Sequence, residues 1–128
     1  GQNWSITSFS PEGLRSSGYA PWIAMIRAGL MGCGGLRIDH AFGLARLWVI
    51  PEGGATGDGA YLSYPFEDLI RLATLEAHRA GALIIAEDLG TAPHGFTAAV
   101  TARQMLGMRV LWFERAEDHG FIGAGDYP

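Results

Sequence analysis

Segments of helical periodicity alternate with short apolar runs along the middle of this chain, and the alternation limits the fold to a few architectures. Apolar residues at helical spacing predict helices over three segments: 21–30, 65–79 and 93–106. Shorter apolar runs follow these segments and predict strands: GLRIDH at 35–40, ALIIAE at 82–87 and MRVLWFE at 108–114. Strands that alternate with helices form right-handed βαβ units, so we expect an α/β fold with a parallel sheet.

Both ends of the segment 65–79 are typical of a helix. An acidic pair at 67–68 lies in its first turn, where it complements the helix dipole, and Gly81 follows its last turn. The first twenty residues are rich in Ser and Gly and are predicted to form a loop. A glycine cluster makes the stretch 51–61 a second predicted loop.

Composition and charge exclude several functional classes. The 128 residues are 48% hydrophobic and 17% charged, which predicts one globular domain or part of one. The net charge of −4 offers no basic patch for nucleic acid, and no apolar run is long enough to cross a membrane, so we expect neither partner. The single cysteine, Cys33, provides no internal disulfide and no metal-ligand spacing, which suits the reducing cytoplasm. The chain begins without methionine and has no signal-peptide pattern, so we expect it to be a piece of a longer protein.

An acidic residue stands at the end of each predicted strand. These residues are Asp39, Glu87 and Glu114. Ligands and chemistry gather at the carboxyl ends of parallel strands, because the loops of an α/β fold converge there. A single carboxylate in such a place is often only a helix cap or a surface ion pair. Two or three in the same position indicate a candidate active site.

The neighbours of these acids suggest different roles for Asp39 and Glu87. Side chains alternate along a strand, so Arg37 and Asp39 should share one face while His40 points to the other. We expect the Arg37 cation to favour a charged Asp39, as a nucleophile requires. A more apolar setting would favour a protonated Glu87, as a general acid requires.

Three other residues near these acids need an interpretation. Asp88 is the better candidate for a structural hydrogen bond, so the chemistry is assigned to Glu87. His40, beside Asp39, is the one histidine that we take as a site candidate. Trp4 lies in a polar loop, where a tryptophan can stack on a sugar ring.

Five stretches, in this order, resemble the amylomaltases, the 4-alpha-glucanotransferases or disproportionating enzymes of the alpha-amylase clan. They are GLRIDHAFGL, GAYLSYPFEDL, TLEAHRAG, IAEDLGTAP and GMRVLWFE. The opening GQNW is a further similar stretch, and the resemblance runs from there to about Glu114. Their agreement in order and spacing is far more specific than RID or AEDLG alone.

The resemblance implies a partial (β/α)8 TIM barrel with about three parallel strands and connecting helices. Residues 1–128 would be an internal segment of a single catalytic barrel whose first and last parts lie outside this chain. It implies a retaining transfer of α-1,4-glucan segments between maltooligosaccharides, with no cofactor and no metal. Asp39 would be the nucleophile and Glu87 the acid/base. The implied substrate-binding residues are Arg37, His40, Gln2 and Trp4.

One departure from the clan keeps two alternatives open. The clan uses a third carboxylate, an aspartate next to a histidine, and no matching motif follows Glu114. The first alternative is an enolase-type barrel in which Asp39, Glu87 and Glu114 bind Mg²⁺. The second is a remnant that binds glucan without turning it over. For the same reason we expect these 128 residues alone to be inactive.

Overall fold

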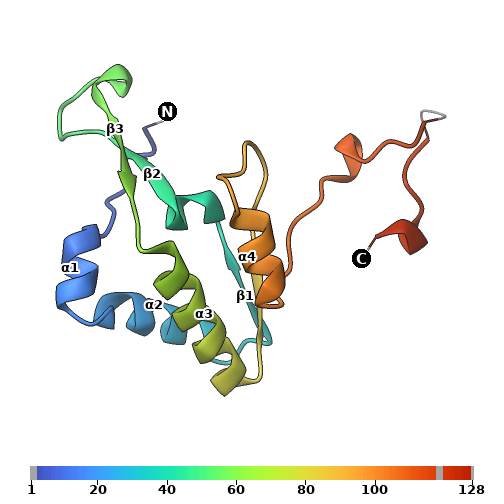
Figure 1. The fold of residues 1–128 in the computed structure, drawn as a ribbon, viewed down its shortest axis with the longest axis horizontal. Helices are drawn as coiled ribbons and strands as arrows, with labels where there is room; N and C mark the ends of the chain where they lie inside the picture. The colour runs from blue at the N-terminus through green and yellow to red at the C-terminus, as the bar shows by residue number, and fades with distance from the viewer. Residues whose placement is uncertain (1–2, 118–119, 128) are drawn as a thin grey trace.

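Two parallel strands, β1 (Gly35–Ile38) and β4 (Leu83–Ala86), form the sheet at the centre of the fold. The computed structural model describes residues 3–117 and 120–127. The register pairs Gly35 with Leu83 and Ile38 with Ala86, so both strands end at the same level. Figure 1 shows them side by side, with α3 packed along them. The predicted parallel pairing of these two strands is confirmed.

The described part of the chain contains four α-helices: α1 (Pro11–Ser16), α2 (Ala20–Leu30), α3 (Phe66–Ala80) and α4 (Phe96–Ala102). The predictions for α2 and α3 are correct to within a residue at each end. Helix α4 is shorter than the predicted 93–106, because left-handed residues flank it: Gly95 (φ 76°) before its start and Gln104 (φ 57°) beyond its end. Helix α1 lies in a predicted loop, where the Ser10 side chain accepts a hydrogen bond from the Gly13 N–H and caps its first turn.

An antiparallel hairpin separates β1 from α3, in a region predicted to be mostly loop. Its strands are β2 (Arg46–Val49) and β3 (Ala60–Ser63), which pair Arg46 with Ser63 and Val49 with Ala60. The Trp48 and Tyr61 rings pack edge to face across it at 5.0 Å. In Figure 1 the hairpin extends from the end of the sheet at which β1 ends.

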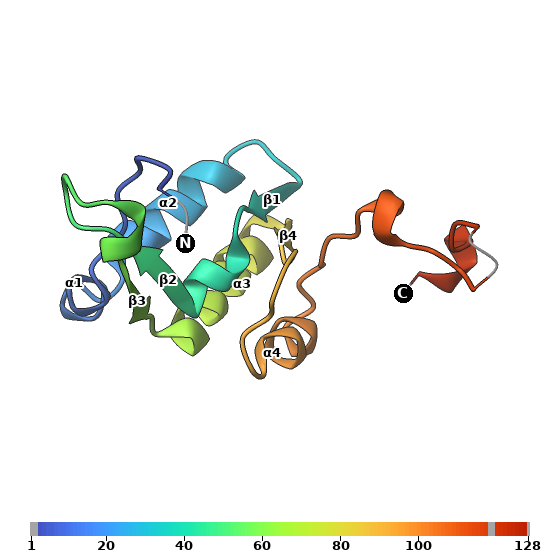
Figure 2. The ribbon, with the colours of Figure 1, turned by 90° about the horizontal axis from the view of Figure 1, so that it is seen from above.

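The prediction of a third strand over residues 108–114 is wrong. Leu106 alone bridges Ile85 in a parallel arrangement, and residues Leu111–Phe113 form a 3-10 turn with exposed side chains. The Met108 N–H donates to the Asp88 side chain instead of to a strand, and no described strand pairs with residues 108–114. A strand-forming sequence needs such a partner, because β propensity depends on neighbours. Figure 2 shows this C-terminal part standing away from the rest.

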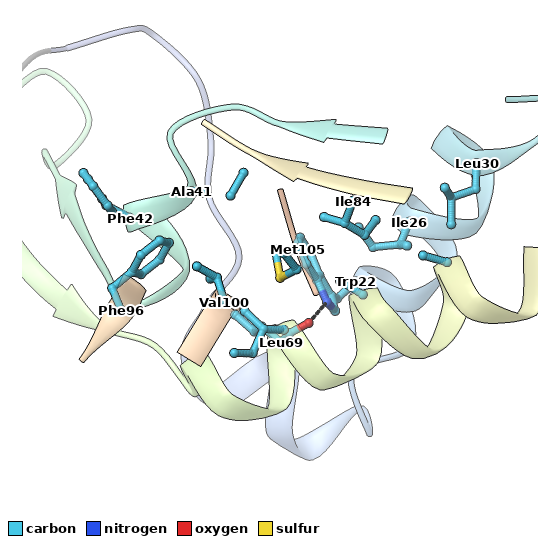
Figure 3. Close-up of a cluster of buried hydrophobic side chains, with 14 of the residues drawn as sticks. Trp22, Ile26, Leu30, Ala41, Phe42, Leu69, Ile84, Phe96, Val100 and Met105 are labelled. Atoms are coloured by element: carbon cyan, nitrogen blue, oxygen red, sulfur yellow. Dashed lines mark hydrogen bonds between the residues drawn. The ribbon is translucent and has the colours of Figure 1, made fainter. Parts of the chain in front are cut away.

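The core lies between the sheet and helices α2, α3 and α4 (Figure 3). Its buried apolar residues come from all of these elements and include Trp22, Ile26, Leu69, Ile70, Ala73, Ile84, Phe96 and Val100. Trp22 docks α2 on α3, because its indole N–H donates to the Leu69 carbonyl oxygen at 3.0 Å. No helix in the described parts of the chain combines the length and apolar character needed to span a bilayer.

A buried carboxylate joins α2 to α3 at the other end of the core. Glu76 is only 5% exposed and accepts hydrogen bonds from Arg27 at 2.7 and 3.0 Å and from Arg79 at 2.8 Å. The hydrogen bond from Arg27 is the main reason that the pKa of Glu76 is lowered from its usual value, with Arg79 adding to it and burial opposing it.

Candidate active site

Asp39 and Glu87 follow neighbouring parallel strands and lie at the same end of the sheet, as the sequence predicts. Backbone pairing continues past both strands, because the Glu87 N–H donates to the Ile38 carbonyl at 2.9 Å. The Ala41 N–H in turn donates to the Glu87 carbonyl at 2.9 Å. These bonds fix the Glu87 backbone against the residues on either side of Asp39.

Arg37 and Asp39 share one face of β1, which confirms the prediction from strand alternation. The Arg37 Nη2 lies 2.6 Å from the Asp39 Oδ1, and the Asp39 side chain is 76% exposed. Among the described residues, Asp39 Oδ2 has no hydrogen-bond partner. One carboxylate oxygen is therefore held by the guanidinium, and the other is accessible to an incoming molecule.

Arg37 makes a second contact that the sequence did not reveal. Its Nε–H donates to the Met108 sulfur at 3.1 Å, which brings residues 71 positions apart into contact. Met108 is held in turn by Asp88, whose Oδ1 accepts the Met108 backbone N–H at 2.8 Å. Asp88 is thus a structural hydrogen-bond acceptor, as expected.

Backbone N–H groups surround the Glu87 carboxylate. Its Oε2 accepts the His40 N–H at 2.8 Å, and its Oε1 accepts the Leu89 N–H at 3.2 Å. This polar setting differs from the apolar one that the sequence suggested, because the loops after β1 and β4 turn their amides toward the side chain. His40 reaches Glu87 through a left-handed backbone, with φ 45° and ψ 55°, which is uncommon for a residue other than glycine.

Two of the remaining sequence candidates, Trp4 and Glu114, are not gathered with this pair. Trp4 is exposed on the segment before α1 and forms no hydrogen bond with the strand-end residues that the structure describes. Gln2 lies outside the described residues. Glu114 ends the exposed 3-10 turn, and in the described ranges no group of three or more His, Cys, Asp or Glu side chains is placed to hold a metal ion. The structure therefore gives no support to a shared magnesium site of Asp39, Glu87 and Glu114.

Sequence comparison relates the whole chain to one family. The family model for glycoside hydrolase family 77, described as 4-alpha-glucanotransferase, matches residues 1–128. A 4-alpha-glucanotransferase of Mycobacterium tuberculosis is 42% identical over 123 residues, which cover 96% of this chain and 17% of that protein. One from Haemophilus influenzae is 41% identical over 128 residues, which cover all of this chain and 18% of that protein. The chain therefore spans less than a fifth of the length of these relatives.

Solved structures agree with the sequence comparison. An amylomaltase from Corynebacterium glutamicum superposes with a TM-score of 0.84 at 38% identity, over 89% of this chain and 16% of that one. An amylomaltase from Streptococcus agalactiae in complex with acarbose gives a TM-score of 0.72 at 25% identity, over 89% of this chain and 23% of that one. The α/β arrangement of parallel strands and helices is thus shared with these proteins.

Proposed function

Because this chain belongs to the 4-alpha-glucanotransferase family, we propose that it is part of an enzyme that moves α-1,4-glucan segments from one glucan to another. The observation that carries the proposal is the pairing of Asp39 and Glu87 after adjacent parallel strands, with Arg37 on Asp39. Retaining enzymes that act on glycosidic bonds need such a pair, one carboxylate as nucleophile and the other as acid and base.

In the first half of the proposed reaction, Asp39 is the nucleophile and Glu87 the acid. Asp39 attacks the anomeric carbon through the oxygen that Arg37 leaves accessible, and the glycosidic C–O bond breaks. Glu87 gives its proton to the leaving oxygen, so the shortened glucan departs with a free 4-hydroxyl. The products are a covalent glucosyl ester on Asp39 and a charged Glu87, which the His40 and Leu89 amides stabilise.

In the second half, an acceptor glucan replaces water. Glu87 takes the proton of the acceptor 4-hydroxyl, the acceptor oxygen attacks the anomeric carbon, and the ester bond to Asp39 breaks. The new bond has the same anomeric configuration as the old one, because the carbon is inverted twice. Chain number is conserved in this reaction, and glucan length is redistributed.

The substrate contacts are proposed for residues around this pair. Arg37 would hold both Asp39 and a sugar hydroxyl, and His40 would contact the same sugar. Gln2 and Trp4 would line the cleft further out. The acarbose complex of the Streptococcus agalactiae relative supports a maltooligosaccharide or α-1,4-glucan as the ligand class. We propose no cofactor and no metal, and the single cysteine favours the cytoplasm.

We also propose that residues 1–128 are an internal segment of one (β/α)8 catalytic barrel. The likeness to amylomaltases over 16% to 23% of their length supports this placement. Further strands and a third carboxylate would then come from sequence outside this chain.

Maltotriose is the substrate that tests the proposal on the full-length protein. We expect the products to be glucose together with oligosaccharides longer than maltotriose, and chromatography measures both. Asp39→Asn should abolish both products, and Glu87→Gln should slow them by about 10²- to 10⁴-fold, the usual contribution of a general acid. Glu52→Gln is the matched control, because Glu52 is exposed in a loop. Glucose without longer products, or full activity of Asp39→Asn, would refute the proposal.

A further inference from the structure

Met108 and the segment around it reach the nucleophile through Arg37. We propose that Met108 is a positioning residue of the transfer reaction, which holds the Arg37 guanidinium in the orientation that presents Asp39 for attack. Asp88 and Gly107 hold Met108 in place. This inference rests on the proposed function, because it assumes that Asp39 is the nucleophile.

The Arg37 and Asp39 pair needs such support. Its side chains are 47% and 76% exposed, and exposed ion pairs are weak because solvent screens them and both side chains lose rotamer freedom. The contact to Met108 occupies the Nε of the same guanidinium whose Nη2 binds Asp39. Two contacts on different nitrogens of a planar group fix its rotation, so the Asp39 oxygen that Arg37 binds is fixed as well.

Met108 is suited to this contact by its chemistry. A thioether sulfur is a weak hydrogen-bond acceptor on a flexible, apolar side chain. It accepts the Arg37 N–H without adding a second negative charge that would compete with Asp39 for the cation. A leucine would fill similar space but offers no acceptor.

The backbone of residues 106–108 is anchored to β4, which keeps the sulfur in place. The Leu106 N–H donates to the Ile84 carbonyl at 3.0 Å, and the Leu106 carbonyl accepts the Ala86 N–H at 2.7 Å. One residue later, a Cβ on Gly107 would lie 2.8 Å from the Asp88 Oδ2, a distance too short for side-chain contact. Glycine there lets Asp88 approach and bind the Met108 N–H at 2.8 Å.

The contacts form one continuous path from the loop after β4 to the nucleophile after β1. Asp88 binds the Met108 backbone, the Met108 sulfur binds Arg37, and Arg37 binds Asp39. The residue next to the acid/base therefore helps to orient the nucleophile of the other strand. Neither Met108 nor Asp88 has to touch the substrate for this.

The test compares Met108→Leu with Met108→Gln in the full-length enzyme. The leucine variant removes the acceptor, and the glutamine variant restores one through its side-chain carbonyl. We expect Met108→Leu to lower kcat for attack on an α-glucosyl fluoride by about tenfold, the effect of one lost hydrogen bond to a charged group, with little change in KM. Met108→Gln should recover most of this loss. Met31→Leu, at an exposed methionine that directly follows α2, is the matched control and should leave kcat unchanged.

A further readout separates positioning from packing. Gly107→Ala should reproduce the loss, because it displaces Asp88, and the double variant with Met108→Leu should lose no more than either alone.

Several results would overturn the inference. These are a normal kcat in Met108→Leu, equal losses in the leucine and glutamine variants, or additive losses with Gly107→Ala. They leave the proposed function standing if the wild-type enzyme still disproportionates maltotriose. A wild-type enzyme that fails to do so overturns both.

Discussion

Removing the Phe96 ring is expected to destabilise the fold strongly and to disturb the loop that carries His40. Phe96 begins α4, is 0% exposed, and contacts Phe42 edge to face at 4.8 Å and Phe66 in a stacked arrangement at 5.1 Å. Phe42 belongs to the 3-10 turn Ala41–Leu44, which directly follows His40. The three rings therefore join α4, the start of α3 and the loop next to the candidate active site.

The size of the effect follows from burial and ring contacts. Phe→Ala substitutions in cores cost about 3 to 5 kcal/mol, since they lose transfer free energy and leave a cavity. Full burial and two aromatic partners, each pair worth about 0.5 to 1.5 kcal/mol beyond its area, place Phe96→Ala in the upper part of that range, near 4 to 5 kcal/mol. A loss of this size should lower the urea concentration at the unfolding midpoint clearly, by an amount equal to the loss divided by the urea slope of the full-length protein.

Urea titration of the full-length protein, followed by tryptophan fluorescence, measures this shift. The control is Leu75→Ala on α3, a side chain that is 42% exposed, which should change the free energy of unfolding by no more than about 0.5 kcal/mol. The residual activity of Phe96→Ala in buffer should fall below that of the control. If the two variants unfold at the same urea concentration, the three-ring cluster does not organise this part of the fold.

Three further predictions concern charge, backbone and metal. Because the pKa of Glu76 is lowered by Arg27, its stabilisation is present above its unfolded pKa of about 4.3 and is lost as the pH falls through the lower folded value. Melting curves should thus show Glu76→Gln well below wild type at pH 7 and the gap closing below about pH 4, whereas a gap independent of pH would contradict this. His40→Gly should raise KM for maltotriose but keep the N–H that binds Glu87. In His40→Val, whose side chain disfavours a left-handed backbone, kcat should be about tenfold lower than in His40→Gly. Equal kcat values in the two variants would show that this backbone conformation does not matter. Exhaustive treatment with EDTA should leave transferase activity intact, and activity that vanished and returned with Mg²⁺ would favour the enolase-type alternative.

The elements that could be predicted from the sequence are those with local signals. Helix α3 combines an apolar face with acids in its first turn and Gly81, at φ 64°, just beyond its end. The strand 83–86 is short, continuous and apolar. Because these signals lie within each segment itself, the sequence was enough to predict that Asp39 and Glu87 lie at the same end of the sheet.

Strands β2 and β3, which were missed, and the third strand, which was wrongly expected, depend on partners outside their own segments. Strands β2 and β3 are joined by residues 50–59, a connection too long for the usual hairpin signal, and the contact of Trp48 with Tyr61 holds them together. Residues 108–114 look like a strand, but no strand among the described residues pairs with them. Propensity alone cannot supply that partner strand.

The contacts of the candidate site also fall into those that the sequence predicts and those that it does not. The shared face of Arg37 and Asp39 follows from alternation along one strand, so spacing was enough to predict the ion pair. The contact of Arg37 with Met108 depends on a third segment, which lies against β4 through Leu106. The His40 amide reaches Glu87 only because its backbone is left-handed, and nothing in the residue type requires that.

Trapping the covalent intermediate tests the central claim, that Asp39 is the nucleophile and Glu87 the acid/base. Full-length Glu87→Gln is incubated with an α-glucosyl fluoride, whose fluoride leaves without a proton, so attack proceeds while transfer to an acceptor is slowed. Peptide mass spectrometry should then find one sugar on the peptide that contains Asp39, and none in the double variant with Asp39→Asn. Sugar attached to any other residue, or an adduct that survives in the double variant, would contradict the account.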